Sequence, residues 1–235
     1  MLEIIPSVNA ETWEKVRDQI LKVAPHADWI ELDIFDGKFV KRISWNNPED
    51  LKNFITEKTV RLAAHLMIQD PQLQLEPWIK AGVRRIIVQW EAIKPRGPLA
   101  FLAARKVKNQ VQTMLKLCQE NWVEFGISLS PASKIKEIAH FLPELNLVQV
   151  LANAPGSPGR DPLPQAFLLA SELNEIRRKQ KFGYKLEWDI GVNPDTLDAI
   201  KATGADLACA TSFIFNAANP VQALEHLHKK ARGLI

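Results

Sequence analysis

Three short segments of the chain alternate charged residues with apolar ones, and these charged residues could do chemistry. They are Glu31 and Asp33 in 29–35, His65 in 61–68, and Lys185, Glu187 and Asp189 in 184–190. Alternate residues of a strand point to opposite faces, so the charged residues of each segment would share one face. Carboxylates and imidazole bind divalent cations and transfer protons, and both kinds of chemistry are therefore open to this set.

Asp33, His65 and Asp189 stand near the C-terminal ends of their segments. If they face one another in a protein interior, desolvation and repulsion cost several kcal/mol unless a cation or a hydrogen-bond network compensates. A divalent metal is the simplest compensation. The alternative is that Glu31 pairs with Lys185 and that His65 is only hydrogen-bonded.

Strand-like and helix-like segments alternate along the whole chain. Short apolar runs predict strands at 2–6, 29–35, 61–68, 84–90, 122–129, 146–151, 184–190 and 206–210. Helical periodicity predicts helices at 10–23, 48–55, 71–81, 99–119, 133–141, 164–179, 195–202 and 218–230. Asn47, Asp70 and Asn193 each precede a proline and are expected to cap the helices that follow.

Eight alternations of strand and helix predict an α/β protein, a (β/α)₈ TIM barrel that forms one domain over residues 1–235. An open, doubly wound sheet is the structural alternative. The closed barrel is favoured because it leaves no strand edge exposed and because no composition break or long linker divides the chain. The apolar face of each strand must meet the helices, so the charged face would point into the barrel, toward the end where such barrels carry their chemistry.

Composition excludes several classes of protein. The chain has 235 residues, 46% hydrophobic and 24% charged, with a net charge of +3, which is typical of a globular protein and gives no basic arm for nucleic acid. Two cysteines are too few for a disulfide framework. The N-terminus lacks a basic leader, and no apolar stretch approaches the roughly 20 residues of a membrane span. We therefore expect a soluble cytoplasmic protein without nucleic-acid or membrane partners.

Seven motifs, in order, resemble those of the ribulose-phosphate 3-epimerase family, nearly from end to end. They are Pro6-Ser7, Glu31-Leu-Asp-Ile-Phe-Asp-Gly-Lys-Phe-Val40, His65-Leu-Met67, Val88-Gln-Trp-Glu-Ala92, Pro155-Gly156, Asp189-Ile-Gly-Val-Asn-Pro194, and Gly204-Ala-Asp206 with Ser212-Phe-Ile-Phe215. The resemblance implies a barrel of the ribulose-phosphate-binding type. It also implies an isomerase that interconverts D-ribulose 5-phosphate and D-xylulose 5-phosphate by 1,1-proton transfer in the pentose phosphate branch of carbohydrate metabolism.

The resemblance assigns roles to residues of this chain. Asp33 and Asp189 match the two aspartates that move the C3 proton, and a divalent metal would be bound by Glu31, Asp33, His65 and Asp189. Substrate contacts would come from Ser7, His65, Met67, Gly156, Gly159, Arg160, Gly191, Thr211 and Ser212. For Ser7, an ordinary role as a turn or cap serine before Asn9 is the alternative.

The chain departs from the family pattern at the metal site. The family motif is His-x-Asp-x-Met-Asp-Gly, and this chain has Glu31 in place of the histidine and Phe35 in place of the methionine. A carboxylate ligand shifts preference toward manganese, magnesium or iron over zinc. The alternative is that Glu31 binds no metal and is a satisfied carboxylate inside the barrel.

The loops that would bind phosphate depart further, because one glycine in each has been replaced, by Pro158, Ile190 and Thr211. Glycine lets a backbone approach a phosphate closely, so the phosphate site is expected to be weakened. Arg160 could supply a direct charge instead. The loop 38–45 carries three cations and two aromatics and is either a lid or an ordinary solvated loop.

The function predicted from these residues is a metal-dependent epimerase of the ribulose-phosphate 3-epimerase type. One alternative is an epimerase for another ketose phosphate, such as a hexulose 6-phosphate, because Phe35, Leu151 and Trp45 could reshape the pocket. The other is a catalytically impaired relative that binds a sugar phosphate or a protein partner.

Trp13 and Trp78 leave room for an apolar contact in a homo-oligomer, but core packing is the favoured role for both.

Overall fold

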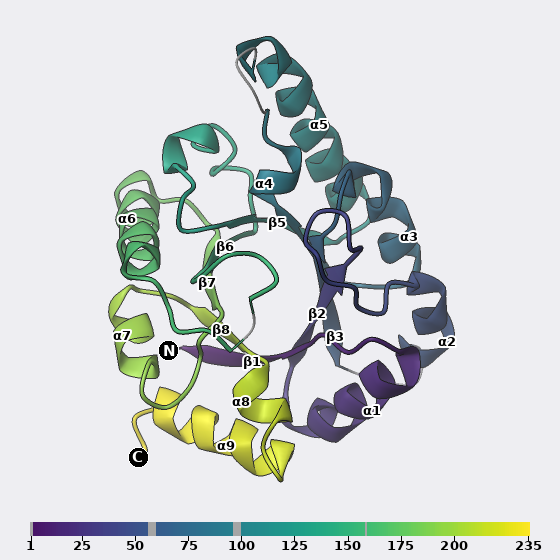
Figure 1. Ribbon diagram of the computed structural model, residues 1–235. Coiled ribbons are helices and arrows are strands. Elements are labelled where there is room, and N and C mark those ends of the chain that lie inside the picture. The colour runs from purple at the N-terminus through teal and green to yellow at the C-terminus, as the bar shows by residue number, and fades with distance from the viewer. Residues whose placement is uncertain (1, 56–59, 96–99, 158) are drawn as a thin grey trace.

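The computed structural model describes residues 2–55, 60–95, 100–157 and 159–235, and it shows a closed parallel barrel. Eight strands pair in chain order, and β8 closes on β1 (Figure 1). The strands are β1 (Glu3–Val8), β2 (Trp29–Phe35), β3 (Arg61–Met67), β4 (Arg85–Gln89), β5 (Glu124–Leu129), β6 (Leu147–Leu151), β7 (Lys185–Asp189) and β8 (Leu207–Ala210). The predicted fold class is confirmed, and the open sheet is excluded.

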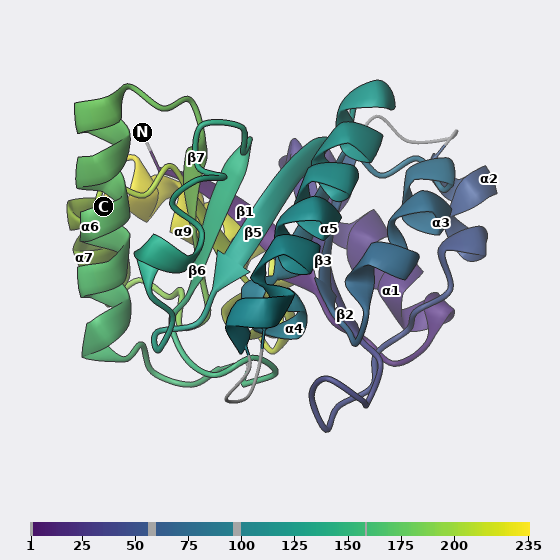
Figure 2. The same cartoon turned by 90° about the horizontal axis from the view of Figure 1, so that it is seen from above.

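Helices surround the barrel on its outside (Figures 1 and 2). They are α1 (Trp13–Val23), α2 (Leu51–Ile55), α3 (Leu75–Lys80), α4 (Trp90–Ile93), α5 (Ala100–Glu120), α6 (Pro164–Gln180), α7 (Leu197–Ala202), α8 (Ser212–Phe215) and α9 (Pro220–Ala231). Short 3₁₀ turns add η1 (Ala24–His26), η2 (Pro48–Asp50), η3 (Pro71–Leu73) and η4 (Ile135–Glu137). The sequence pattern missed α4 and α8, which are each a single turn.

The predicted helix at 133–141 is wrong. Only η4 lies there, and the segment is held by backbone bonds between residues three apart, such as Glu137 N to Lys134 O and Phe141 N to Ile138 O. A segment this short cannot offset helix nucleation by itself, so packing decides its conformation. The predicted helix at 99–119 corresponds to α5, and its first residue lies outside the described part of the chain.

The expected proline-linked caps behave differently from one another. Asn47 and Asp70 form no side-chain cap hydrogen bond, and Asp70 has a left-handed φ of 51°. Asn193 does hold its turn, because its Oδ1 accepts from the backbone N of Asp195 and of Thr196 just before α7. Thr12 caps α1 and Asn219 caps α9, and both were missed.

The barrel interior has two kinds of filling. One set of inward residues is apolar and forms a small cluster of its own, with Ile5, Trp29, Ala63, Ile87, Leu147, Leu207 and Cys209. The other inward residues are polar and buried, at Ser7, Glu31, Asp33, His65, Arg85, Gln89, Ser128, Gln149, Glu187 and Asp189. The outward faces of the strands join the main core under the helices. The predicted inward direction is therefore confirmed for the acidic residues and His65, but Lys185, at the first position of β7, is exposed.

The ring centroid of Trp45 lies 5.1 Å from that of Trp13 and 5.7 Å from that of Trp78. Trp45 and Trp78 are buried core residues, and Trp13 is half-buried and packs against the same core. Among the described residues, no helix is long and apolar enough to cross a membrane.

Candidate active site

Adjacent strands β2 and β3 place three of the predicted residues together. Asp33 and His65 are partners in the strand register, and Glu31 precedes Asp33 on the same inward face. His65 Nδ1 lies 3.5 Å from Asp33 Oδ1 and 3.8 Å from Glu31 Oε1. The strand register places Asp33 and His65 at the same depth in the barrel, and alternation places Glu31 on the same inward face two residues earlier.

Asp189 reaches the same place from β7. Glu31, Asp33, His65 and Asp189 form what we call the acidic cluster, in which each residue offers one ligand atom and all these atoms lie within 4.8 Å of one another. All four residues are buried, and Glu31 Oε2, Asp33 Oδ1 and His65 Nδ1 have no hydrogen-bond partner among the described residues. Unpartnered buried acceptors that converge in this way fit a cation, so the acidic cluster could hold a divalent metal.

The electrostatics of the acidic cluster indicate the same need for positive charge. Burial and then the charge of Asp33 raise the pKa of Asp189 to about 8. Burial, followed by the charge of Glu187, raises the pKa of Glu31 well above its ordinary range. Burial alone would lower the pKa of His65, but its contact with Asp33 outweighs this and raises the pKa. Each of these shifts favours the more positive form of the group. A bound cation would supply that positive charge instead.

Ser7 lies within β1 and is fully buried. Its Oγ donates a hydrogen bond to Asp33 Oδ2 at 2.8 Å, so Ser7 orients one of the two aspartates and is not a turn or cap serine. Ser44 holds the end of β2, the strand that carries Asp33, because its Oγ donates to the carbonyl of Asp33 and accepts from Phe35 N. No signal in the sequence pointed to Ser44.

Beneath the acidic cluster lies a buried network that the sequence analysis missed in part. Gln149 Nε2 donates to Glu31 Oε1 at 3.0 Å and to Glu187 Oε1 at 2.9 Å. Arg85 Nη1 lies 3.6 Å from Glu187 Oε2, and its guanidinium stacks 4.0 Å from the ring centre of Trp29. Arg85 could have been found, since it shares the inward alternation of 85, 87 and 89 in β4.

The alternative pairing of Glu31 with Lys185 is wrong. Lys185 stands at the first position of β7 and is exposed. Among the described residues, Arg85 is the fully buried arginine, and it lies inside the barrel. An arginine suits this place because it stays charged when buried and can share its donors between Glu187 and Glu124.

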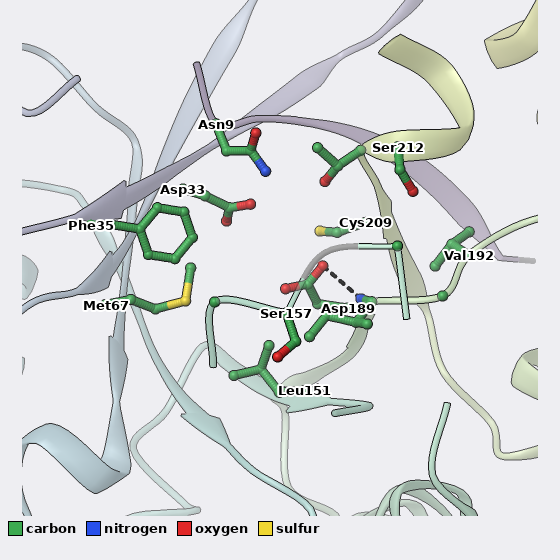
Figure 3. Close-up of a pocket in the computed structure, with 15 residues that line it drawn as sticks. Asn9, Asp33, Phe35, Met67, Leu151, Ser157, Asp189, Val192, Cys209 and Ser212 are labelled. Carbon is green, nitrogen blue, oxygen red and sulfur yellow. Dashed lines mark hydrogen bonds between the residues drawn. The ribbon is translucent and has the colours of Figure 1, made fainter. Parts of the chain in front are cut away.

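A pocket opens above the acidic cluster at the C-terminal ends of the strands (Figure 3). Its wall contains Asp33 and Asp189 from opposite parts of the barrel, together with Cys209. Six of the expected substrate-binding residues line it, namely Met67, Gly156, Gly159, Gly191, Thr211 and Ser212. The wall also contains residues that the sequence analysis did not propose as substrate contacts: Asn9, Phe35, Leu151, Ser157, Ile190 and Val192.

Three expected substrate-binding residues do not line this pocket. Ser7 and His65 are buried below it and reach it through Asp33. Arg160 is exposed and is absent from the pocket wall. Trp45, which was expected to shape the pocket, packs instead with Trp13 and Trp78 on the outside of β2.

The loop after β2 approaches the loop after β6 on the same side of the barrel (Figure 2). A Cβ built on Gly156 would lie 3.4 Å from Val40, so the two loops are in contact. Asp36 organises the first loop, since its carboxylate accepts from the backbone N of Lys38, of Phe39 and of Gln69. Arg42 lies over the Phe35 ring at 5.3 Å, which keeps one loop cation near the pocket mouth.

Comparison with known proteins identifies the family. The profile of the Ribulose-phosphate 3 epimerase family matches residues 3–215. The chain belongs to the ribulose-phosphate 3-epimerase family. The ribulose-phosphate 3-epimerase of Mycobacterium leprae (strain TN) is 24% identical over 97% of this chain and 94% of its own length. That of Bacillus subtilis (strain 168) is 25% identical over 97% of this chain and 98% of its own length.

Solved structures resemble the chain in fold. A 3-hexulose-6-phosphate synthase superposes with a TM-score of 0.71 and 17% identity, covering 97% of this chain and 99% of the other. KGPDC from Streptococcus mutans superposes with a TM-score of 0.69 and 14% identity, over 99% of this chain and 98% of the other. At these identities the likeness shows the barrel fold alone.

Membership of the ribulose-phosphate 3-epimerase family makes the altered glycines informative. Ile190, which replaces a glycine of the family motif, has a φ of +76°, a conformation that β-branched residues rarely adopt. Two hydrogen bonds hold this turn, from Ile190 N to Asp189 Oδ1 and from Trp188 Nε1 to the Ile190 carbonyl. The backbone at Ile190 therefore adopts a conformation that favours glycine. Pro158 lies outside the described residues.

Proposed function

We propose that this member of the ribulose-phosphate 3-epimerase family interconverts D-ribulose 5-phosphate and D-xylulose 5-phosphate. The observation that carries the proposal is that Asp33 and Asp189, on strands far apart in the chain, both line one pocket at the C-terminal end of the barrel. Two carboxylates that reach a substrate from different strands suit a reaction that removes a proton from one face of a carbon and returns it on the other.

In the proposed mechanism one aspartate accepts the C3 proton, and an enediolate forms. The other aspartate then donates a proton to the opposite face of C3. Ser7 keeps Asp33 in position through its hydrogen bond to Oδ2. The phosphate would lie among Gly156, Gly159, Gly191, Thr211 and Ser212, where the backbone and two hydroxyls can approach it.

Glu31, Asp33, His65 and Asp189 would bind a divalent cation, which could be manganese, iron, zinc or magnesium. When bound, the cation supplies positive charge that stabilises the oxygens of the enediolate. Three carboxylates and one imidazole favour manganese, iron or magnesium over zinc.

A second candidate function is epimerisation of another ketose phosphate. Phe35 favours it, because this ring lines the pocket where the family motif has a flexible methionine.

A cytoplasmic location is supported by one relative, the cytoplasmic isoform of ribulose-phosphate 3-epimerase from rice (Oryza sativa subsp. japonica). It is 26% identical over 88% of this chain and 84% of its own length.

The test is incubation with D-ribulose 5-phosphate in deuterated water, with manganese, iron or zinc supplied, while NMR follows exchange at C3. We expect deuterium at C3 and the appearance of D-xylulose 5-phosphate. Exchange only with another sugar of a ketose phosphate panel, such as a hexulose 6-phosphate, would select the second candidate. Absence of exchange across the panel and all three metals would refute catalysis and leave a binding protein.

Substitution of the two aspartates tests their roles. Asp33→Asn and Asp189→Asn should each abolish turnover, because the amide can neither accept the C3 proton nor return one. Circular dichroism should show that both variants remain folded, and binding of the substrate phosphate should persist. Full activity in either variant would remove that aspartate from proton transfer.

A further inference from the structure

The second ring nitrogen of His65 is held by an unexpected partner outside the acidic cluster. His65 Nε2 lies 3.2 Å from Gln89 Oε1, while His65 Nδ1 faces Asp33 and Glu31 without a hydrogen-bond partner among the described residues. Both His65 and Gln89 are fully buried, so no water from bulk solvent competes for these atoms. A neutral imidazole carries its proton on only one nitrogen, and the partner of each nitrogen decides which one.

Gln89 is held in turn by Glu91, which stands in the first turn of α4. Glu91 Oε2 accepts a hydrogen bond from Gln89 Nε2. Glu91 Oε1 accepts from Ser130 N at 3.1 Å, from Ser130 Oγ at 2.8 Å and from Ser133 Oγ. Burial alone would raise the pKa of Glu91, but these hydrogen bonds, from Ser133, Gln89 and Ser130, outweigh it and lower the pKa. Glu91 is therefore an ionised carboxylate at neutral pH.

An ionised carboxylate can only accept hydrogen bonds, and this fixes the direction of the whole chain of contacts. Because Glu91 accepts, the amide nitrogen of Gln89 must face it, and the amide oxygen must face His65. Because that oxygen also only accepts, His65 Nε2 must carry the proton. His65 Nδ1 is then left with a lone pair directed at the acidic cluster, where the described residues offer it no donor.

We propose that Glu91 is a positioning residue that acts through Gln89 to fix His65 in the tautomer whose Nδ1 is ready to bind the cation. The proposal rests on the cation site of the proposed function. Outer partners of this kind orient a metal-binding imidazole, and their loss costs about 10-fold to 100-fold in metal affinity. The sequence pattern pointed to Val88-Gln-Trp-Glu-Ala92 as a family motif without giving it a task.

Glu91→Gln is the informative variant because it keeps the shape of residue 91 and reverses its hydrogen bonding. Ser130 and Ser133 would hold the oxygen of the new amide, which leaves its nitrogen to donate to Gln89. The Gln89 amide would turn over, so that its nitrogen donates to His65 Nε2 and the imidazole proton moves to Nδ1. In that tautomer Nδ1 donates toward Asp33 and cannot bind a metal.

The experiment measures the tautomer directly in the metal-free protein, labelled with ¹⁵N at histidine and held at a pH above the raised pKa of His65, where the imidazole is neutral. We expect protonated Nε2 in the wild type and protonated Nδ1 in Glu91→Gln. Calorimetric titration with Mn²⁺ should show affinity about 10-fold to 100-fold weaker in the variant. Adding Gln89→Glu to Glu91→Gln should restore both the tautomer and the affinity, since residue 89 then accepts from both neighbours.

A control and a second variant separate the possible outcomes. Glu137→Gln removes a nearby carboxylate that accepts from Trp90 Nε1 and has no described contact with His65, and it should alter neither readout. If Glu91→Gln fails to fold, Gln89→Met removes the acceptor while Glu91 stays, and it should give a mixture of tautomers. An unchanged tautomer in the variant that folds would overturn the proposal. A tautomer change in a protein that binds no Mn²⁺ would refute the cation site and keep the positioning role.

Discussion

At the scale of single residues, Glu31 is a departure from the family motif that bears directly on metal binding. It stands where the family motif has histidine, its Oε1 is held by Gln149, and its Oε2 is buried without a partner among the described residues. A satisfied barrel carboxylate would have both oxygens paired. The unpaired oxygen therefore favours a role as a metal ligand over a purely structural role inside the barrel. Metal affinity distinguishes these two roles.

Glu31→Gln should change stability and metal binding in opposite directions. Burial and the charge of Glu187 raise the pKa of Glu31, so removing its charge should make the metal-free protein more stable at neutral pH. If Glu31 binds the cation, Mn²⁺ affinity should fall by at least about 10-fold. Chemical denaturation and calorimetry give the two quantities. Greater stability with unchanged Mn²⁺ affinity would assign Glu31 to the barrel interior alone.

Glu91 predicts the response to acid. Its folded pKa is lowered, so its hydrogen bonds contribute their full stability above the ordinary pKa of 4.5 and lose it as the pH falls through the folded value. Glu91→Gln does not titrate. The difference in free energy of unfolding between wild type and variant should therefore be largest at neutral pH and shrink below about 4.5. Urea unfolding at several pH values measures it, and a difference that grows in acid would contradict this assignment.

At the scale of the elements, the turn after β7 connects the acidic cluster to the pocket mouth. Ile190 and Gly191 both have positive φ, at 76° and 73°. A Cβ on Gly191 would lie 2.6 Å from Pro162 Cδ and 3.0 Å from the Arg160 carbonyl. The loop after β6 therefore packs directly on this turn, and glycine is required here for space as well as for conformation.

Gly191→Ala should destabilise the protein by about 1–3 kcal/mol and weaken binding of the sugar phosphate. Gly183→Ala is the matched control, because a Cβ there would meet nothing within 4 Å, and it should stay within about 0.5 kcal/mol of wild type. Thermal unfolding gives the stabilities. Equal stability of the two alanine variants would show that the turn relaxes freely.

At the scale of the whole molecule, the barrel contains more acid than its net charge suggests. Glu31, Asp33, Glu187 and Asp189 are all buried inside it, and Arg85 is the fully buried arginine among the described residues. Its guanidinium pairs with Glu124 at 2.7 Å and lies near Glu187. We infer that Arg85 compensates the buried charge of Glu187, while the acidic cluster could hold a cation.

Arg85→Met should cost about 3–5 kcal/mol, because it leaves a buried carboxylate without its partner. The neighbouring Arg84 is exposed, so Arg84→Met should have little effect. Adding Glu187→Gln to Arg85→Met should recover part of the loss, since the unpaired charge is then removed. Denaturant unfolding tests all three variants. A similar loss in the Arg84 and Arg85 variants would rule out this role.

The sequence by itself determined the alternation of strands and helices, the inward direction of Glu31, Asp33, His65 and Asp189, and the end of the barrel where they meet. These follow from local periodicity, because the side chains of a strand alternate between its two faces whatever its neighbours are. Only the tertiary structure decided that Arg85 and not Lys185 neutralises the interior, that Arg160 stays out of the pocket, and that 133–141 forms no helix. Those outcomes depend on the register between strands and on packing between loops, where residues distant in the chain compete for the same partners.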